Sequence, residues 1–211
     1  MKISLINGSQ KTGESNTELI LKRFSGLINE THEVNIFYCG LKQLTNEMFN
    51  KIISGDVILL LFPLFVHSLP SNTLKMLIEL ENIIKQQPKK DLIMYTIVNN
   101  GFYEGKQNNI VFEIIQNWCE QSGVKFGGGI GQGAGEMIGR TKHLPKDKDL
   151  FKNLTCALQT MIENLEMKKQ MEIQYLSPYF PRFLWRFMAT RHWNNLAKGN
   201  GLSKKDILKK L

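Results

Sequence analysis

Short apolar segments of the kind that form β-strands alternate with amphipathic helical segments five times within the first 165 residues. Residues 56–62 are apolar at every position after the first, a pattern typical of a parallel strand that is covered on both faces. Regular alternation of strand and helix requires a parallel sheet with helices on both sides. The sequence therefore predicts an α/β doubly wound sandwich, whose strands would span residues 3–6, 32–38, 56–62, 91–98 and 124–130.

The first predicted strand leads into a loop rich in hydroxyl groups and then into an amphipathic helix. Residues 8–17 contain two glycines and four hydroxyl side chains. At the N-terminus of a helix, free backbone N–H groups and the positive end of the helix dipole attract an anion, and hydroxyl groups add further donors. This order of elements predicts a loop that holds a phosphate group.

The glycine spacing excludes two well-known phosphate loops. Gly8 and Gly13 have the separation of a Walker loop, but Glu14-Ser15 stands where that motif needs Lys followed by Ser or Thr. The G-x-G-x-x-G fingerprint of dinucleotide-binding domains is absent from this loop. The remaining prediction is a loop that binds one phosphate monoester. The alternative is that residues 15–18 are simply an S-x-x-E capping box at the start of a helix. A capping box explains Ser15 and Glu18 but not the hydroxyl groups before them.

Two further loops belong to the same edge of the predicted sheet. Five strands with one phosphate loop favour the flavodoxin-like order 2-1-3-4-5, in which ligands bind beyond the carboxyl ends of the strands, beside strands one and three. Residues 63–70 place Phe65 between two prolines and suit a flat ring, whereas residues 99–104 offer amides that suit the polar edge of a ring system. Together the three loops describe a flavin mononucleotide (FMN) site.

Three segments carry a resemblance to a known family: I-N-G-S-x-x-x-x-x-S-N-T, P-L-F-V-H-S-L-P and N-N-G-F-Y. Residues 1 to about 165 resemble the NAD(P)H-dependent FMN reductases and related quinone and nitro reductases of flavodoxin-like fold. The resemblance implies that the phosphate is held by Ser9, Lys11, Ser15, Asn16 and Thr17. It also implies that the isoalloxazine ring is lined by Pro63, Leu64, Phe65 and Val66 and contacted on its other side by Asn99, Asn100 and Gly101.

The resemblance implies an FMN-dependent NAD(P)H oxidoreductase in which the flavin carries the chemistry, so no separate catalytic residue is expected. Hydride would pass from nicotinamide to flavin and on to a quinone, nitro, azo or free-flavin acceptor, and a homodimer would complete the site. Phe65 departs from the family, where tyrosine is common, so no phenol is available there. The alternative is an electron-carrier flavodoxin or a flavin-binding protein without turnover; carriers are usually strongly acidic, and this sheet domain is nearly neutral.

Two features near the predicted site allow more than one interpretation. His67 is either a cation that stabilises the reduced flavin or an ordinary polar residue of a surface loop. The glycine run 127–135 formally contains a dinucleotide fingerprint, but no βαβ unit and no ribose-binding acid accompany it. We expect this run to be a close-packed loop near the site that could admit the nicotinamide.

Cysteine usage and hydropathy favour a cytoplasmic protein. Cys39, Cys119 and Cys156 are odd in number and lack metal-ligand spacing, so no zinc or iron–sulfur centre is expected. The N-terminus leads directly into a strand and shows no signal-peptide pattern. The longest apolar run, residues 57–66, is interrupted by a proline and is much shorter than a membrane span.

The positive charge is concentrated near the C-terminus. Residues 1–165 hold 17 Lys and Arg against 16 Asp and Glu, whereas residues 166–211 hold 10 against 3. We therefore expect a flavodoxin-like domain over residues 1–170 and a basic, aromatic, helical extension over residues 171–211, with Ser203 and Asp206 capping a short Lys-rich helix.

The extension has three interpretations. It is a helix that packs on the sheet domain or on a dimer mate, or a basic amphipathic helix that contacts an anionic membrane and makes the protein a membrane-attached quinone reductase. Nucleic-acid binding is not expected, because no recognition motif accompanies the charge.

Overall fold

The computed structural model describes residues 1–211 except 12, 41, 89–90, 145–147, 204–205 and 207–211. The chain forms two compact units, Met1–Pro178 and Tyr179–Leu211, which are described separately. The boundary lies later than the division at residue 170 that the sequence suggests, because a strand at residues 174–176 belongs to the first unit.

The first unit is built on a parallel six-stranded sheet in the order β2-β1-β3-β4-β5-β6. The strands are β1 (Lys2–Asn7), β2 (Glu33–Tyr38), β3 (Val57–Pro63), β4 (Ile93–Asn99), β5 (Lys125–Gln132) and β6 (Gln174–Leu176). The predicted doubly wound fold and the order of its first five strands are confirmed. The predicted number of strands was one too few, because β6 is a three-residue edge strand and is too short to show an alternating pattern.

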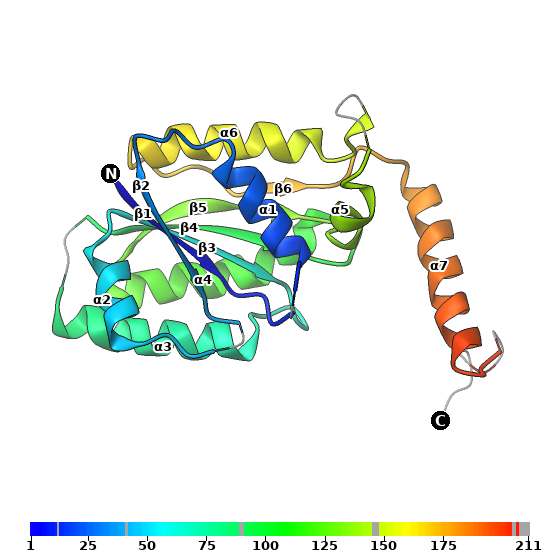
Figure 1. Cartoon of the computed structure of the whole chain (residues 1–211), viewed down its shortest axis with the longest axis horizontal. Helices are drawn as coiled ribbons and strands as arrows, with labels where there is room; N and C mark the ends of the chain where they lie inside the picture. The colour runs from blue at the N-terminus through cyan, green and yellow to red at the C-terminus, as the bar shows by residue number, and fades with distance from the viewer. Residues whose placement is uncertain (12, 41, 89–90, 145–147, 204–205, 207–211) are drawn as a thin grey trace. The chain divides into compact units, whose positions relative to one another are not determined.

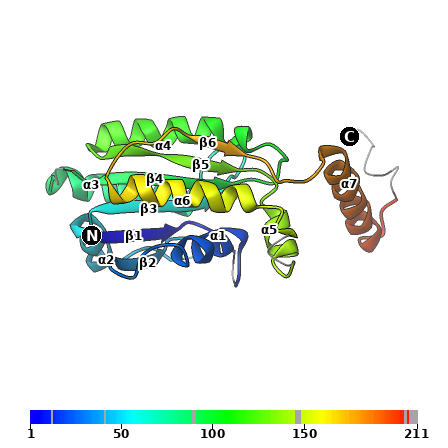
Figure 2. The same cartoon turned by 90° about the horizontal axis from the view of Figure 1, so that it is seen from above.

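Helices cover both faces of this sheet. Figure 1 shows α1 and α6 on one face and α2, α3 and α4 on the other, and Figure 2 shows α6 running along the sheet. The bounds are α1 (Asn16–Ser25), α2 (Asn46–Ser54), α3 (Ser71–Gln86), the short 3-10 helix η1 (Gly105–Asn108), α4 (Asn109–Ser122), α5 (Glu136–Thr141) and α6 (Lys152–Glu166). The helices on both faces explain why β3 and β4 are buried almost throughout, as their unbroken apolar sequences require.

The inner face of α3 agrees only in part with its apolar spacing, which predicts that Leu74, Leu77, Ile78, Glu81 and Ile84 point inward. Leu77 and Ile84 are buried, but the side chains of Leu74 and Ile78 are 44% and 51% exposed. The buried positions of α3 are Thr73, Met76, Leu77, Leu80 and Ile84. Thr73 Oγ1 donates to the carbonyl of Gly8 at 3.2 Å, so a polar contact that periodicity cannot indicate helps to set the rotation of the helix.

The predicted fifth strand, residues 124–130, is confirmed, but β5 continues through Gly131 and Gln132, which the sequence assigned to a loop. A Cβ on Gly129 would stand 2.4 Å from the ring of Phe112 and 2.5 Å from the carbonyl oxygen of Thr96. Gly128 has a φ of +97°, and a Cβ there would meet the carbonyl oxygen of Met171 at 2.1 Å. These glycines are strand residues that allow α4 and the segment before β6 to approach the sheet closely.

The second unit contains α7 (Arg182–Gly199), which begins directly after Pro181. The structure describes every residue of α7, and none of them is buried. The predicted cap after α7 is confirmed, because Asp206 accepts hydrogen bonds from the backbone N–H and the hydroxyl of Ser203. Most of the Lys-rich helix predicted after it lies outside the described residues. Among the described helices, none is both long enough and apolar enough to cross a membrane.

Candidate functional site

The carboxyl ends of β1, β3 and β4 bring the three predicted loops together around one open groove of about 320 Å³. Its lining residues are Ser9, Gln10, Lys11, Ser15, Asn16, Thr17, Pro63, Phe65 and Asn99. All of them except Gln10 belong to the set of candidate residues. Segments that are more than eighty residues apart in the chain therefore meet where the fold favours ligand binding.

The other candidate residues lie beside the groove rather than in its lining. Leu64 packs against the hydrophobic core, and the Val66 side chain is 96% exposed. Asn100 is buried, and Gly101 is exposed beside the carboxylate of Glu136. The fifth of these residues, His67, stacks its ring on another aromatic ring, as described below.

The start of α1 presents backbone donors to the groove. Ser15 is the N-cap, and its hydroxyl oxygen accepts a hydrogen bond of 3.0 Å from the backbone N–H of Glu18. Within the described part of the chain, the backbone N–H groups of Asn16 and Thr17 have no acceptor. The Ser15 hydroxyl keeps its own proton for donation, so this helix end offers three donors to an anion.

Only half of the capping box forms. Glu18 does not return its carboxylate to Ser15; Asn7 Nδ2 donates to it at 2.8 Å and the Tyr38 hydroxyl donates at 3.3 Å. The capping interpretation is therefore correct for Ser15 but incomplete for Glu18. Because capping occupies the oxygen of Ser15 and not its proton, the cap is compatible with anion binding.

The charges around the loop also favour an anion. Lys11 is the cation in the groove lining. The carboxylate of Glu14 forms ion pairs with Lys142 and, at 3.1 Å, with Lys22. The hydrogen bonds from Lys142 and Lys22 lower the pKa of Glu14 and keep it paired as a carboxylate. The acid nearest to the phosphate loop is thus compensated by two cations.

Hydrogen bonds fix the groove from three directions. Thr17 Oγ1 donates to Asn99 Oδ1 at 2.8 Å, joining α1 to the end of β4. Asn16 Oδ1 accepts from the N–H of Gly139 in α5 at 3.1 Å. The backbone N–H of Leu64 donates to the carbonyl of Asn99 at 2.9 Å. Since the Thr17 hydroxyl donates to Asn99 and Asn16 Oδ1 is an acceptor that already has a partner, the donors left for a ligand at these two residues are their backbone N–H groups and Asn16 Nδ2.

Residues 65–68 form a tight turn at the rim of the groove. Phe65 and Ser68 exchange two backbone hydrogen bonds, each of 2.9 Å. The two central residues have positive φ angles, 48° at Val66 and 59° at His67. A β-branched residue with positive φ is strained, and such strain is concentrated at functional sites. The turn presents the half-exposed Phe65 ring to the groove.

His67 connects the second loop to the third. Its ring stacks on that of Phe102, with centroids 5.8 Å apart and an interplanar angle of 16°. The His67 side chain is exposed, as expected of a surface-loop residue, and its ring is also a packing element between two loops that border the groove.

Two buried polar atoms near this edge lack partners among the described residues. They are Oδ1 of Asn100, after β4, and Oε1 of Gln132, at the end of β5. An unpaired buried acceptor costs free energy, and such groups are concentrated at functional sites. Sequence analysis missed Gln132 because the glycine run hid the end of β5; its position beside Asn99 in the sheet register is the signal that would have found it.

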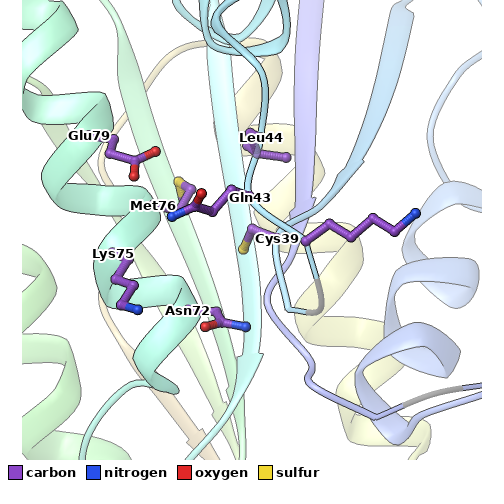
Figure 3. A pocket seen from close by; sticks show the side chains of 8 residues that line it. Cys39, Gln43, Leu44, Asn72, Lys75, Met76 and Glu79 are labelled. Atoms are coloured by element: carbon purple, nitrogen blue, oxygen red, sulfur yellow. The ribbon is translucent and has the colours of Figure 1, made fainter.

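A second hollow, of about 200 Å³, lies between α3 and the segment after β2. Figure 3 shows Asn72, Lys75, Met76 and Glu79 on α3 opposite Cys39, Gln43 and Leu44. Burial raises the pKa of the Cys39 thiol to about 11, so it remains a neutral thiol, and Asn72 Nδ2 is occupied by the carbonyl of Gly40. This hollow lies away from the three predicted loops, which meet at the groove, so we take the groove as the candidate cofactor site.

No family model and no curated protein matches the chain. Solved structures do match. An NADH:FMN oxidoreductase in its apo form aligns with a TM-score of 0.58 and 12% identity, over 81% of this chain and 91% of that chain. An NADPH-quinone reductase from P. pentosaceus aligns with a TM-score of 0.56 and 14% identity, over 76% of this chain and 96% of that chain. A flavodoxin from the domain Archaea aligns with a TM-score of 0.51 and 14% identity, over 79% of this chain and 99% of that chain.

These likenesses establish the class of the first unit. It has the flavodoxin-like fold, and the resemblance drawn from the three loop segments is confirmed at the level of the fold. At such low identities the structural match carries the fold alone. The function has to be argued from the groove.

Proposed function

We propose that this protein is an FMN-dependent NAD(P)H oxidoreductase that reduces a quinone, nitro, azo or free-flavin acceptor. The observation that carries the proposal is the pair of unpartnered N–H groups at Asn16 and Thr17, which lie at a groove also lined by Pro63 and Phe65. The N–H donors suit a phosphate group, and the apolar and aromatic lining suits a flat ring, so a molecule that contains both groups matches the groove.

The residues of the groove divide into two groups by chemistry. Ser9, Lys11 and Ser15, with the two free N–H groups, would hold the phosphate. Pro63, Leu64 and Phe65 would lie beside the isoalloxazine ring, and Asn99, Asn100 and Gly101 would lie at its other side. Bound FMN would supply the hydride chemistry, accepting from a nicotinamide and passing electrons to the acceptor.

The rim of the groove fits a stacked acceptor. Phe65 and Phe102 are each nearly half exposed, and Val66 is almost fully exposed. Phe65 has no hydroxyl group, so the rim would select an acceptor by apolar stacking rather than by a phenolic hydrogen bond. The flavin-dependent and quinone-reducing neighbours support this class of reaction.

An electron carrier without nicotinamide turnover is the second candidate, and the similarity to an archaeal flavodoxin favours it. The charge of the sheet domain argues against it, because residues 1–165 carry nearly equal numbers of acidic and basic groups. A carrier usually docks its partner through a strongly charged surface.

Two measurements test the proposal. The first is the absorption spectrum of the purified protein, followed by denaturation and identification of the released chromophore; a protein that neither contains nor takes up FMN contradicts it. The second is consumption of NADH and NADPH, each with a simple quinone. Bound FMN without consumption of either nucleotide would establish the carrier instead.

A further inference from the structure

The second unit has a strong excess of positive charge. Residues 179–211 contain eight Lys and Arg and a single acidic residue, Asp206. Asp206 hydrogen-bonds to Ser203, outside α7. Within α7 itself, four cations and no acid occur, and among the described residues Arg186, Arg191 and Lys198 form no ion pair. These three cations are therefore available to an anionic partner.

The same helix exposes large apolar side chains. Phe183 is 71% exposed and Phe187 is 64% exposed. Together with Leu184 and Met188, they occupy positions i, i+1, i+4 and i+5, which lie on one face of the first turns. Arg182 and Arg186 lie on the adjoining face. Exposed aromatic groups next to cations mark an interaction surface.

None of the 18 residues of α7 is buried, so the helix gains little stability from packing of its side chains. It also ends in a stretch with two asparagines and a glycine, which are weak helix formers. Binding to another surface would therefore stabilise it further.

Charge complementarity indicates which kind of partner α7 would bind. A second copy of the chain has no net negative charge to attract this helix, since residues 1–165 are nearly neutral overall and residues 166–211 are basic. An anionic membrane attracts Arg and Lys through its headgroups and accepts Phe and Trp at the boundary with the acyl chains. No described helix is long and apolar enough to cross a bilayer, which leaves a position in the interface.

We propose that α7 binds the interface of a membrane containing anionic lipids, with the Phe183 and Phe187 face inserted and Arg182 and Arg186 at the headgroups. The inference stands on the second unit alone and is independent of the flavin site.

Co-sedimentation of the full chain with vesicles tests this proposal. We expect binding to phosphatidylcholine vesicles that contain phosphatidylserine, little binding to phosphatidylcholine alone, and loss of binding at high salt. The double variant Arg186→Glu/Arg191→Glu should lower the partition coefficient by at least about 25-fold, because each basic group contributes about fivefold. The matched control Lys51→Glu/Lys75→Glu makes the same change in net charge on exposed helices of the first unit and should bind almost as the original protein does.

The apolar face is tested separately with Phe183→Ser/Phe187→Ser. This variant should lose membrane binding by about tenfold or more while the circular dichroism of the first unit is retained. The proposal is overturned if the original protein does not bind anionic vesicles, or if Arg186→Glu/Arg191→Glu and Lys51→Glu/Lys75→Glu bind them equally well. It is also overturned if vesicles are not bound and light scattering shows a dimer that Phe183→Ser/Phe187→Ser dissociates. Binding of RNA or DNA by α7 in the absence of vesicle binding would overturn it as well.

Discussion

Thr17 Oγ1 donates a hydrogen bond of 2.8 Å to Asn99 Oδ1, and both side chains are buried where α1 meets the end of β4. The contact joins the phosphate loop to the loop after β4, although the two residues are 82 positions apart in the chain. It therefore fixes the distance between the two parts of the groove that we assign to the phosphate and to the ring.

Replacing Thr17 by Val should remove that hydrogen bond and leave Asn99 Oδ1 buried without a donor. We expect a loss of about 1 to 3 kcal/mol in the free energy of unfolding, measured by urea denaturation without added FMN. Thr17→Ser keeps the hydroxyl group, so its loss in the free energy of unfolding should be clearly smaller. A loss in Thr17→Ser without a loss in Thr17→Val would show that packing of the Thr17 methyl group, rather than the hydrogen bond, matters.

Replacing Asn16 by Pro tests the free backbone donors directly. Asn16 is the first residue of α1, where proline is well tolerated, and Ser15 before it has the extended conformation that a following proline requires (φ −104°, ψ 163°). The variant removes one N–H group. FMN affinity, measured by quenching of flavin fluorescence, should fall by about 10-fold or more, since hydrogen bonds to charged groups contribute about 1.5 to 3 kcal/mol.

The matched control for this experiment is Asn16→Ala. It also loses the side-chain hydrogen bond to Gly139 but keeps the backbone N–H. If Asn16→Ala weakens FMN as much as Asn16→Pro does, then the side chain and not the backbone donor is responsible, and the assignment of the phosphate to this helix end is wrong.

The strained turn gives a stabilising prediction. Val66 has a φ of 48° and an almost fully exposed side chain, so replacing it removes strain without loss of packing. Val66→Asn should raise the free energy of unfolding by about 1 kcal/mol, because asparagine adopts positive φ more readily. Val66→Ile, which is also β-branched, should leave it unchanged. The midpoints of urea denaturation compare the three proteins, and no gain for Asn would mean that the turn is relaxed.

Much of the fold was predictable because it depends on local patterns. The unbroken apolar sequences of β3 and β4 indicate strands covered on both faces, and the structure buries them. The loop after β1 was predictable as a group because its hydroxyl residues precede a helix start. What local patterns could not show is which atoms remain free: the partners of Asn16 and Thr17 come from residues more than eighty positions away.

The errors have physical causes of the same kind. The rotation of α3 depends on a contact between Thr73 and Gly8, and the continuation of β5 depends on side chains of other elements that fill the space over its glycines. Neither contact has a local signature, because glycine itself disfavours strands and only tertiary packing makes it the required residue there.

Gly129→Ala tests this role of the glycines. The new Cβ would meet the Phe112 ring and the Thr96 carbonyl at distances of 2.4 and 2.5 Å, so strand and helix would have to separate. We expect a loss of about 1 to 3 kcal/mol in the free energy of unfolding. Gly26→Ala is the matched control, since its Cβ would meet its nearest neighbour at an ordinary 3.5 Å, and it should be nearly neutral. A neutral Gly129→Ala would mean that α4 is packed loosely on β5.

Two buried thiols should lower the free energy of unfolding of the protein in alkaline solution. Burial raises the pKa of Cys39 to about 11 and that of Cys119 to about 12, from an ordinary value of 9.0. Below about pH 8 both states of the protein keep these protons and no stability is lost. As the pH rises from 9 toward 11, the unfolded chain releases them and the folded protein does not, so the free energy of unfolding should fall, by about 2 kcal/mol near pH 10.

Urea denaturation between pH 8 and pH 10.5 measures this loss. The variant Cys39→Ala/Cys119→Ala is expected to be less stable at pH 8, because it leaves cavities in the core, but its free energy of unfolding should depend much less on pH. The exposed Cys156 provides the control, since Cys156→Ala should keep the pH dependence of the original protein. If the alkaline slope persists in the double variant, the buried thiols are not its cause.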